Sequence, residues 1–250
     1  MTPRLLLSAA LVALTATPLA AFEIGEMTAE ERMIFRSEVR AYLMDNPEVL
    51  LEAIDVLERR QAEEQAANDV ALVETNREEL VNDGYSYVGG NPDGDITVVE
   101  FLDYRCGYCR KAHPEVTELI ESDGNIRYVI KEFPILGEQS VLASRFAIAV
   151  KQVEGDEAYY DVHNDLMTMR ADVTEEALTA MAEEKGFDTP EIFAAMNSDS
   201  VQEIIMQNRA LAQRMQINGT PSFIFGDEML RGYLPLDAMR EILAEERAEG

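Results

Sequence analysis

The chain contains two cysteines, Cys106 and Cys109, which lie three residues apart with Gly107 and Tyr108 between them. A disulfide that closes so short a loop removes little entropy from the unfolded chain, so the pair is a poor structural staple. At the start of a helix, unsatisfied N–H groups and the helix dipole favour a thiolate, the attacking species in disulfide exchange. The spacing therefore predicts a redox pair. Cys106, the more exposed, attacks a substrate disulfide, and Cys109, one turn deeper, resolves the mixed disulfide.

Cations flank this pair in a strongly acidic chain. Arg105, Arg110 and Lys111 fall within seven residues that contain no carboxylate, whereas the 250 residues together carry a formal net charge of -27. Positive charge lowers the pKa of a nearby thiol, so we expect Arg105 and Arg110 to stabilise the Cys106 thiolate. The overall acidity excludes nucleic acid as a partner, because a phosphate backbone needs a basic face.

A metal site is the other chemistry that the two thiols allow. Cys106, Cys109 and His113 could lie near one helical face, but three soft ligands without a fourth make a poor closed zinc site. Transient copper(I) binding by the two thiolates is chemically plausible. We expect no resident cofactor or metal. The twelve methionines are interpreted as core filling, at positions such as Met167 and Met206, rather than as a copper-binding array.

The cysteines lie where a strand is followed by a helix. The apolar run from Ile96 to Leu102 predicts a buried strand, residues 106–121 predict a helix with Pro114 inside it, and residues 126–133 predict a further strand. A short strand is expected before them at Tyr85 to Val88. The pattern is a β-α-β unit with the cysteine pair at the junction of its first strand and its helix.

Helical spacing dominates the segment from residue 137 to residue 217, where His163 is interpreted as a packing residue rather than a catalytic one. Strand character returns at Ser222 to Phe225. A turn and a second short strand at residues 228–231 complete a hairpin, and residues 236–244 predict a terminal helix.

Residues 22–83 predict a helical extension in front of this unit. Thr28 and Glu31 have the spacing of a capping box. A second helix is expected to start with Asn46 as its N-cap and Pro47 in its first turn. Its apolar stripe has no domain of its own to cover it, so the extension either associates with other copies or packs on the catalytic unit.

The first residues have the layout of a secretory signal peptide, expected to span residues 1–21. Arg4 precedes an uncharged apolar run from Leu5, and small residues at Ala20 and Ala21 mark the expected cleavage site. The run is shorter than the roughly 20 apolar residues that a membrane-spanning helix needs. We therefore expect export to the periplasm, where thiols oxidise readily.

Two motifs together resemble the DsbA and DsbC group of bacterial periplasmic thioredoxin-fold proteins. The first is FLDYRCGYC at residues 101–109, and the second is GTPSF at residues 219–223. The resemblance implies an α/β thioredoxin fold interrupted by a helical domain. Its first half would be residues 84–136, the inserted domain residues 137–217 and its second half residues 218–250.

The same resemblance implies roles for single residues. The bond between Thr220 and Pro221 should be cis and face Cys106, and these two residues together with Gly107 and Tyr108 should bind the substrate chain. Such a site presents backbone groups for strand-like pairing with a client peptide.

Glu100, six residues before Cys106, matches a buried carboxylate that assists proton transfer for the deeper cysteine in DsbA-like proteins. A strand-end glutamate in solvent is the alternative. The dipeptide Gly107-Tyr108 and Thr220 are similar to the isomerase DsbC, whereas DsbA oxidases typically carry Pro-His and Val at these places. The resemblance thus favours a disulfide isomerase or reductase, with a DsbA-like dithiol oxidase as the alternative.

The helical extension before a DsbA-like domain resembles ScsC and Com1-like proteins, in which such an extension mediates oligomerisation. This implies a homo-oligomer formed through residues 22–83, with unfolded or misoxidised exported proteins as clients. A membrane thiol reductase of the DsbD type is the implied redox partner. The alternative from another class is a copper(I)-binding or copper-tolerance protein whose thiols do not turn over.

Overall fold

The computed structural model describes residues 27–249 and the side chains of residues 27–248. The expected signal peptide and its cleavage site lie outside the described residues. The chain divides into two compact units, Met1–Arg59 and Arg60–Gly250. Across residues 27–249, no helix combines the length and the apolar character that a membrane span requires.

The first unit begins with helix α1 (Ala29–Asp45), which has the predicted capping box. The Thr28 hydroxyl accepts from the Glu31 N–H at 3.3 Å, and the Glu31 carboxylate accepts from the Thr28 N–H at 2.8 Å. These reciprocal bonds satisfy N–H groups that the first helical turn leaves free. The capping prediction is confirmed.

Helix α2 (Glu48–Val81) follows and runs for 34 residues. Asn46 was expected to cap its start, but Asn46 instead closes α1, because its N–H and its Nδ2 donate to the Tyr42 carbonyl at 2.8 and 2.9 Å. One short side chain cannot both donate to the end of α1 and accept from the start of α2. The last carbonyls of a helix lack donors just as the first N–H groups of a helix lack acceptors.

Large apolar side chains of the first unit lie exposed, and no residue of α1 is buried. We call this set the N-terminal apolar surface; its members are Met33, Ile34, Phe35, Val39, Tyr42, Met44, Leu50, Leu51, Ile54, Val56 and Leu57. Among residues 27–59, the described part of this unit, neither α1 nor the start of α2 finds a cover for these side chains. An exposed apolar set of this size marks an interaction surface.

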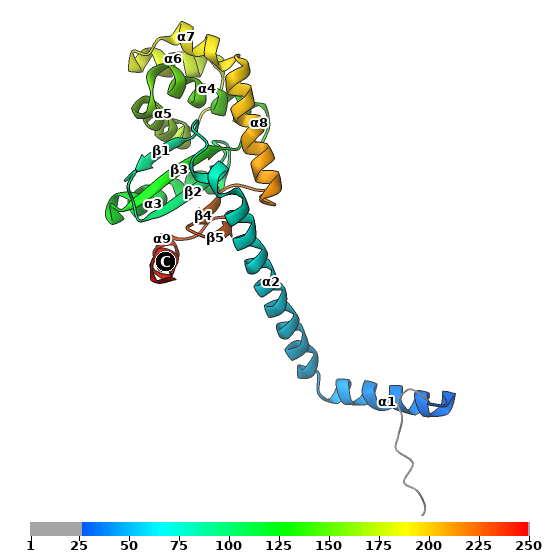
Figure 1. The fold of residues 1–250 in the computed structure, drawn as a ribbon. Coiled ribbons are helices and arrows are strands. Elements are labelled where there is room, and N and C mark those ends of the chain that lie inside the picture. Colours follow the sequence, from blue (N-terminus) through cyan, green and yellow to red (C-terminus); the bar gives the residue numbers. More distant parts are fainter. Residues whose placement is uncertain (1–26, 250) are drawn as a thin grey trace, which may run out of the picture. The chain divides into compact units, whose positions relative to one another are not determined.

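The second unit is built on a five-stranded sheet in the order β1-β3-β2-β4-β5, in which β2 and β3 are parallel and the other pairs antiparallel. Helix α3 (Gly107–Asp123) connects β2 to β3. The expected α/β thioredoxin fold is thereby confirmed (Figure 1). The strands are β1 Tyr87–Gly90, β2 Ile96–Leu102, β3 Ile126–Glu132, β4 Ser222–Phe225 and β5 Glu228–Arg231.

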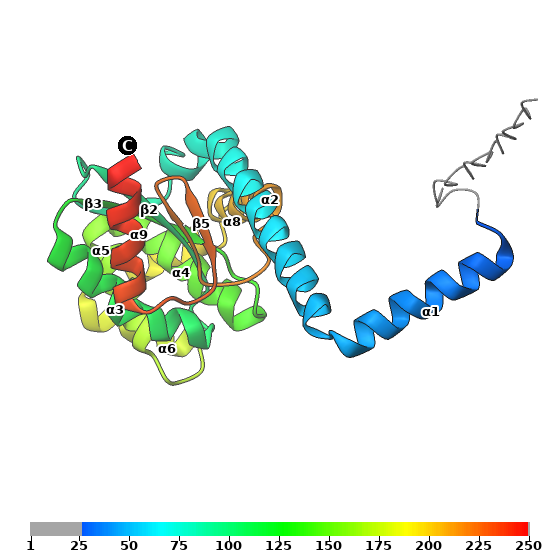
Figure 2. The ribbon, with the colours of Figure 1, turned by 90° about the horizontal axis from the view of Figure 1, so that it is seen from below.

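Side-chain alternation along β2 decides what lies on each face of the sheet. Val98 and Leu102 join the core beneath α3 and α9 (Leu236–Glu249), and Figure 2 shows these two helices side by side. Val99 and Phe101 join a second core with residues of α2 and the end of α8. Because both faces are covered, β2 is mostly apolar, with Thr97 and Glu100 as its polar residues.

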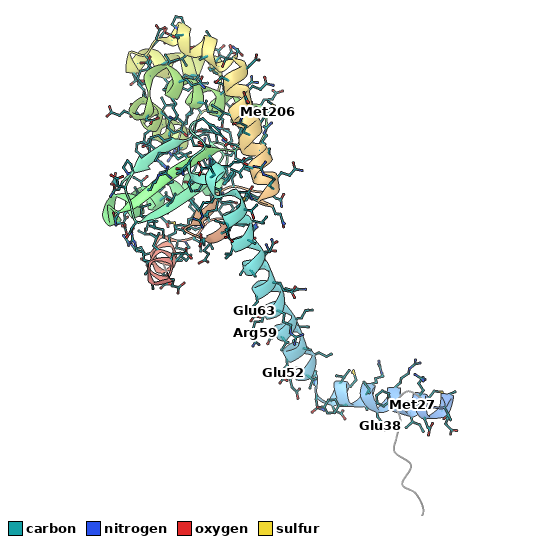
Figure 3. The ribbon with its side chains drawn as sticks, viewed as in Figure 1. Met27, Glu38, Glu52, Arg59, Glu63 and Met206 are labelled. Atoms are coloured by element: carbon teal, nitrogen blue, oxygen red, sulfur yellow. The ribbon has the colours of Figure 1, made fainter. Side chains whose placement is uncertain are left out.

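The segment between β3 and β4 is helical, as expected. Helices α4 to α7 gather beyond one end of the sheet (Figure 1), whereas the end of α8 packs on a face of the sheet. Met206 was assigned to the core but is 53% exposed on the outer side of α8 (Figure 3). Met167, by contrast, is buried as predicted. The helices are α4 Glu138–Glu154, α5 Asp156–Thr168, α6 Glu175–Lys185, α7 Thr189–Met196 and α8 Asp199–Arg214.

Two predicted boundaries move for identifiable reasons. The first strand starts at Tyr87 rather than Tyr85, because the Asp83 carboxylate accepts the N–H groups of Tyr85 and Ser86 at 3.0 and 2.9 Å and holds them in a turn. The last helix continues to Glu249. In its final turn Arg247 pairs with two carboxylates, those of Asp95 and Asp123.

Asp83 also forms a buried ion pair with Lys131 of β3. The Lys131 side chain is fully buried, and its ammonium donates to the Glu79 carbonyl at 2.7 Å and to the Asp83 carboxylate. Burial lowers the pKa of Lys131, and the charge of Asp83 opposes that shift. This pair fastens the end of α2 to the centre of the sheet.

Candidate active site

The helix dipole and the turn after β2 position the two sulfurs. Cys106 is the N-cap residue of α3, with an extended backbone, and Cys109 lies in the first turn of that helix. Cys106 is 7% exposed and Cys109 is 0% exposed, so the predicted order of accessibility holds. Both are free thiols in this structure.

The site around the cysteines is strongly polarised. The pKa of Cys106 is lowered to about 5, chiefly because Cys109 donates a hydrogen bond to its sulfur, with further hydrogen bonds from Thr220 and from backbone N–H groups. Burial raises the pKa of Cys109, and its hydrogen bond to Cys106 and the charge of Glu100 add to the rise. At neutral pH one sulfur is therefore a thiolate and the other a thiol.

The Thr220-Pro221 segment faces Cys106, as the resemblance implied. Its peptide bond is cis, and the Cys106 Sγ lies 3.1 Å from the Thr220 carbonyl oxygen, to which it donates when protonated. The Thr220 hydroxyl is buried, and it has no hydrogen-bond partner at bonding distance and angle among the described residues. A Cys106 thiolate supplies the acceptor that this hydroxyl lacks, in accord with its contribution to the low Cys106 pKa.

Glu100 lies on the face of β2 that carries Val98 and Leu102, the face covered by α3. It is 2% exposed, which makes the solvent-exposed alternative wrong. Tyr128 donates its hydroxyl to one carboxylate oxygen, while the other, Oε1, is buried without a partner among residues 27–248. Burial raises the pKa of Glu100 to about 7, and the charge on Cys106 contributes to the rise.

The two arginines occupy different positions. Arg105 donates to the Ala171 carbonyl at 3.1 Å and lies 3.5 Å from the Asp172 carboxylate, so its guanidinium is engaged with the loop before α6. Arg110 donates from Nε to the Tyr104 carbonyl at 2.7 Å. Burial and the neighbouring charge of Arg105 lower the pKa of Arg110, whereas the charges of Asp103 and Cys106 oppose that shift.

Tyr108, between the cysteines, is 63% exposed and stacks on Tyr233 with ring centroids 6.5 Å apart. The Lys111 ammonium lies 3.9 Å from the centroid of the Tyr233 ring. A Cβ added to Gly107 would meet nothing within 4 Å, so this position opens toward free space. An exposed aromatic surface thus lies beside the sulfurs.

Sequence reasoning missed Asp103, which fastens the turn before Cys106. Its carboxylate is fully buried and accepts the N–H groups of Arg105 at 2.7 Å, Ile135 at 2.8 Å and Leu136 at 3.0 Å. An aspartate between a strand and a helix is a common former of such turns, and that signal was present in the sequence.

Sequence reasoning also missed a buried carboxylate next to Tyr104 that accepts hydrogen bonds from three hydroxyl groups. Glu132, 3% exposed, accepts from the hydroxyls of Tyr104 at 2.6 Å, Tyr159 at 2.7 Å and Ser144 at 2.6 Å. Burial raises the pKa of Glu132 to about 7. His163 is buried against Tyr104, and its pKa falls to about 3 because of burial, which agrees with a packing role.

A closed metal site in a protein needs several ligand side chains close together. Within residues 27–249 no group of three or more His, Cys, Asp or Glu side chains is arranged to hold a metal ion. His113 lies edge-on to His163 with ring centroids 5.1 Å apart.

Alkylation of Cys106 in the reduced protein should rise through a midpoint at about pH 5, because the thiolate forms there and is lost as the pH falls below it. Between roughly pH 7 and 8 the rate should change little. Iodoacetamide kinetics followed by mass spectrometry measure this. Cys109→Ala removes the main hydrogen-bond donor and should move the midpoint upward. A wild-type midpoint near the ordinary thiol value of about 8.5 would contradict the assignment.

Most of the second unit and part of the first match known protein families. Residues 82–245 match the family described as Thioredoxin. Residues 32–64 match the family described as Copper resistance protein ScsC N-terminal domain.

Solved structures of oxidoreductases are also similar to this chain, and two of them illustrate the match. A thioredoxin-like oxidoreductase from Silicibacter pomeroyi is 41% identical, with a TM-score of 0.65, and the match covers 69% of this chain and 98% of that one. Proteus mirabilis ScsC in a transitional conformation is 27% identical, with a TM-score of 0.66, and covers 90% of this chain and 100% of that one.

Curated relatives include Disulfide bond formation protein D of Bacillus subtilis, 24% identical over 169 residues that cover 63% of this chain and 75% of that protein. Na(+)/H(+) antiporter NhaA 1 of Salinispora arenicola is 25% identical over 154 residues. Those residues are 61% of this chain but only 23% of the antiporter, so the chain spans less than a quarter of that relative.

Proposed function

The chain belongs to the thioredoxin family and to its DsbA- and ScsC-like thiol-disulfide oxidoreductases, and from that premise we propose that it reduces and rearranges disulfide bonds of exported proteins. The observation that carries thiol-disulfide exchange at this pair is the opposite shift of the two cysteine pKa values. One thiolate is ready to attack, and one thiol is held back until a mixed disulfide exists. The preference for reduction and rearrangement over oxidation comes from the resemblance of Gly107-Tyr108 and Thr220 to the isomerase DsbC.

In the proposed reaction the Cys106 thiolate attacks one sulfur of a client disulfide. The client S–S bond breaks, a mixed disulfide forms, and the leaving client sulfur departs as a thiolate. In rearrangement a second client thiolate attacks the client sulfur of the mixed disulfide and regenerates the Cys106 thiolate. In reduction Cys109 loses its proton, attacks Cys106 and releases the reduced client.

Glu100 is the proposed acceptor of the Cys109 proton. Its carboxylate lies on the face of the sheet that α3 covers, its charge raises the Cys109 pKa, and Oε1 has no other partner in the part of the chain that the structure describes. A pKa of about 7 lets it take up and return a proton near neutrality.

Glu100→Gln should slow resolution by Cys109 by roughly a hundredfold, the lower range for a positioned acid-base group, and leave attack by Cys106 nearly unchanged. Stopped-flow measurement of each half-reaction on a disulfide-bonded peptide separates the two steps. Tyr128→Phe, which removes the hydroxyl donor but keeps the carboxylate, is the matched control and should retain most of the resolution rate. Equal slowing of both steps by Glu100→Gln would sink the proton-transfer role.

Thr220, Pro221, Gly107 and Tyr108 are the proposed contacts of the client chain. The Thr220 backbone lies against the attacking sulfur, Gly107 opens to free space, and the Tyr108 ring is exposed beside both. Arg110 is proposed to help hold the thiolate, with Arg105 acting through the loop that it binds.

A dithiol oxidase is the second candidate, and the low pKa of Cys106 favours it, because a stabilised thiolate stabilises the reduced protein. Equilibration with glutathione decides between the two. A potential near the roughly -180 mV of protein disulfide isomerase, or lower, supports the reductase and isomerase, whereas one near about -120 mV supports the oxidase. Stoichiometric copper(I) binding without disulfide turnover would support the copper-binding alternative instead.

We further propose that the protein acts in the periplasm and is kept reduced by a membrane thiol reductase of the DsbD type. Unfolded or misoxidised exported proteins are the proposed clients. Mass spectrometry of the exported protein tests cleavage near Ala20 and Ala21. Accumulation of the oxidised pair in cells that lack such a reductase tests the partner.

The N-terminal apolar surface is proposed to hold copies of the chain together. Within the first unit it includes an apolar pocket of about 410 Å³, lined mainly by α1 residues such as Phe35, Val39 and Leu43. The match of residues 32–64 to the ScsC N-terminal domain supports a shared role for this segment.

Val39→Glu should lower the mass of the full protein in solution, because it puts a charge into the proposed contact. Val70→Glu is the matched control, since Val70 is 45% exposed and Val39 41% exposed, but Val70 lies outside the first unit. Light scattering measures both. A monomeric wild type, or equal masses for all three proteins, would refute the assembly.

A further inference from the structure

An apolar pocket of about 860 Å³ lies where β3 passes into α4. Pro134 and Ile135 of the connecting loop, Val141 and Leu142 of α4, and Val173 form apolar walls. Ile135 is 39% exposed and the neighbouring Leu136 is 53% exposed, so the apolar surface continues past the rim of the pocket. Nothing in the reaction proposed above uses this pocket.

Arg145 gives the pocket its polar character. It lines the wall, its Nε is buried without a hydrogen-bond partner, and no ion pair engages its guanidinium in the described part of the chain. A guanidinium that lines a pocket and is engaged by no carboxylate is available to an acidic acceptor brought by a ligand, through a charge-assisted hydrogen bond.

The remaining charges of the pocket favour a negative ligand. Arg209 also lines it and donates to the Pro134 carbonyl at 2.7 Å through one of its nitrogens, whereas Glu138 is the acidic residue of the lining. The pocket lining thus carries two guanidinium groups and one carboxylate, although the chain as a whole has a formal net charge of -27. This local excess of positive charge complements an acidic group.

The pocket is connected to the turn that carries the attacking sulfur. The Asp103 carboxylate accepts N–H groups from both Arg105 and Ile135, so one residue fixes the active-site turn and a pocket wall. Arg105 in turn binds the Ala171 carbonyl, two residues before Val173. A chain seated in the pocket therefore lies along the framework that positions Cys106.

We propose that this pocket binds a client segment in which an acidic residue lies among apolar ones. The apolar side chains fill the pocket and the carboxylate accepts hydrogen bonds from Arg145. The inference rests on the proposed function, because it selects among the disulfide-bearing chains that Cys106 attacks. It makes Arg145 a specificity-determining residue rather than a catalytic one.

Two disulfide-bonded peptides test this, identical apart from a Glu or a Gln within an apolar segment near the disulfide. Wild-type protein should reduce the Glu peptide with a kcat/KM about five- to tenfold higher, as one charge-assisted hydrogen bond allows. Arg145→Gln should abolish that preference and leave the Gln peptide and a small aromatic disulfide unaffected. Arg170→Gln, which changes the charge at an exposed residue outside the pocket, is the matched control and should keep the preference.

Equal rates for both peptides with the wild type would overturn the proposal, as would an equal loss on every disulfide in Arg145→Gln. If Arg145→Gln unfolds, Val141→Glu introduces a carboxylate into the wall and should reverse the wild-type preference. Wild-type protein that reduces neither peptide would refute the proposed function itself, a result distinct from turnover without preference.

Discussion

Cys106→Ala should lower disulfide reduction and rearrangement by roughly a thousandfold or more, because it removes the only accessible thiolate of the pair. Cys109→Ala should behave differently. Cys106 still attacks, but the mixed disulfide is no longer resolved from within, so client protein accumulates in covalent complex with the variant. Insulin reduction and refolding of scrambled ribonuclease measure turnover, and non-reducing electrophoresis measures the trapped complex.

The two variants control each other, because both remove one sulfur from the same helical turn. Loss of insulin reduction in both, with trapping only in Cys109→Ala, assigns attack to Cys106. Trapping by Cys106→Ala instead would exchange the two roles. Full activity of Cys106→Ala would end the proposal of thiol chemistry at this pair.

Asp83→Asn should destabilise the fold by about 3–5 kcal/mol, the usual cost of leaving one charge of a buried ion pair alone. Asn retains a side-chain oxygen for the N–H groups of Tyr85 and Ser86, so the turn keeps its acceptor. What is lost is the negative charge beside Lys131, whose side chain is fully buried. Urea unfolding of the reduced protein measures the change.

Adding Lys131→Met to Asp83→Asn should restore most of that stability, because no uncompensated charge then remains in the core. An exposed pair gives the matched comparison. Asp227→Asn breaks the contact with Arg77, where both side chains are about half exposed, and should cost no more than about 1 kcal/mol. Equal costs for Asp83→Asn and Asp227→Asn would show that burial does not govern the Lys131 pair.

The ends of a strand could be predicted to the exact residue where the sequence pattern of that strand allowed one interpretation. Strand β2 is buried on both faces, so its apolar run ends where the strand ends, and the hairpin of β4 and β5 is bounded by its turn. Strand β1 has no such mark. Its start depends on the hydrogen bonds of the Asp83 carboxylate, which propensity does not reveal.

Single residues were harder to place than elements. Sequence alternation puts Glu100 on a face of β2 but does not tell whether a helix covers that face, and the cover is α3. Glu132 binds Tyr104, Ser144 and Tyr159, which come from separate parts of the chain. Met206 shares helical spacing with core residues of α8, yet it lies on the outer side, since spacing cannot fix how far a buried face extends.

The buried Glu100 has a consequence for proton stoichiometry. Oxidation of the pair releases the Cys109 proton and removes the negative charge from Cys106. That charge is one cause of the raised Glu100 pKa, so disulfide formation lowers this pKa and Glu100 sheds part of a second proton near neutrality. The potential of the pair then depends on pH more steeply than the roughly 30 mV per unit of a one-proton, two-electron couple. The driving force for exchange is thereby tied to the acidity of the surrounding compartment.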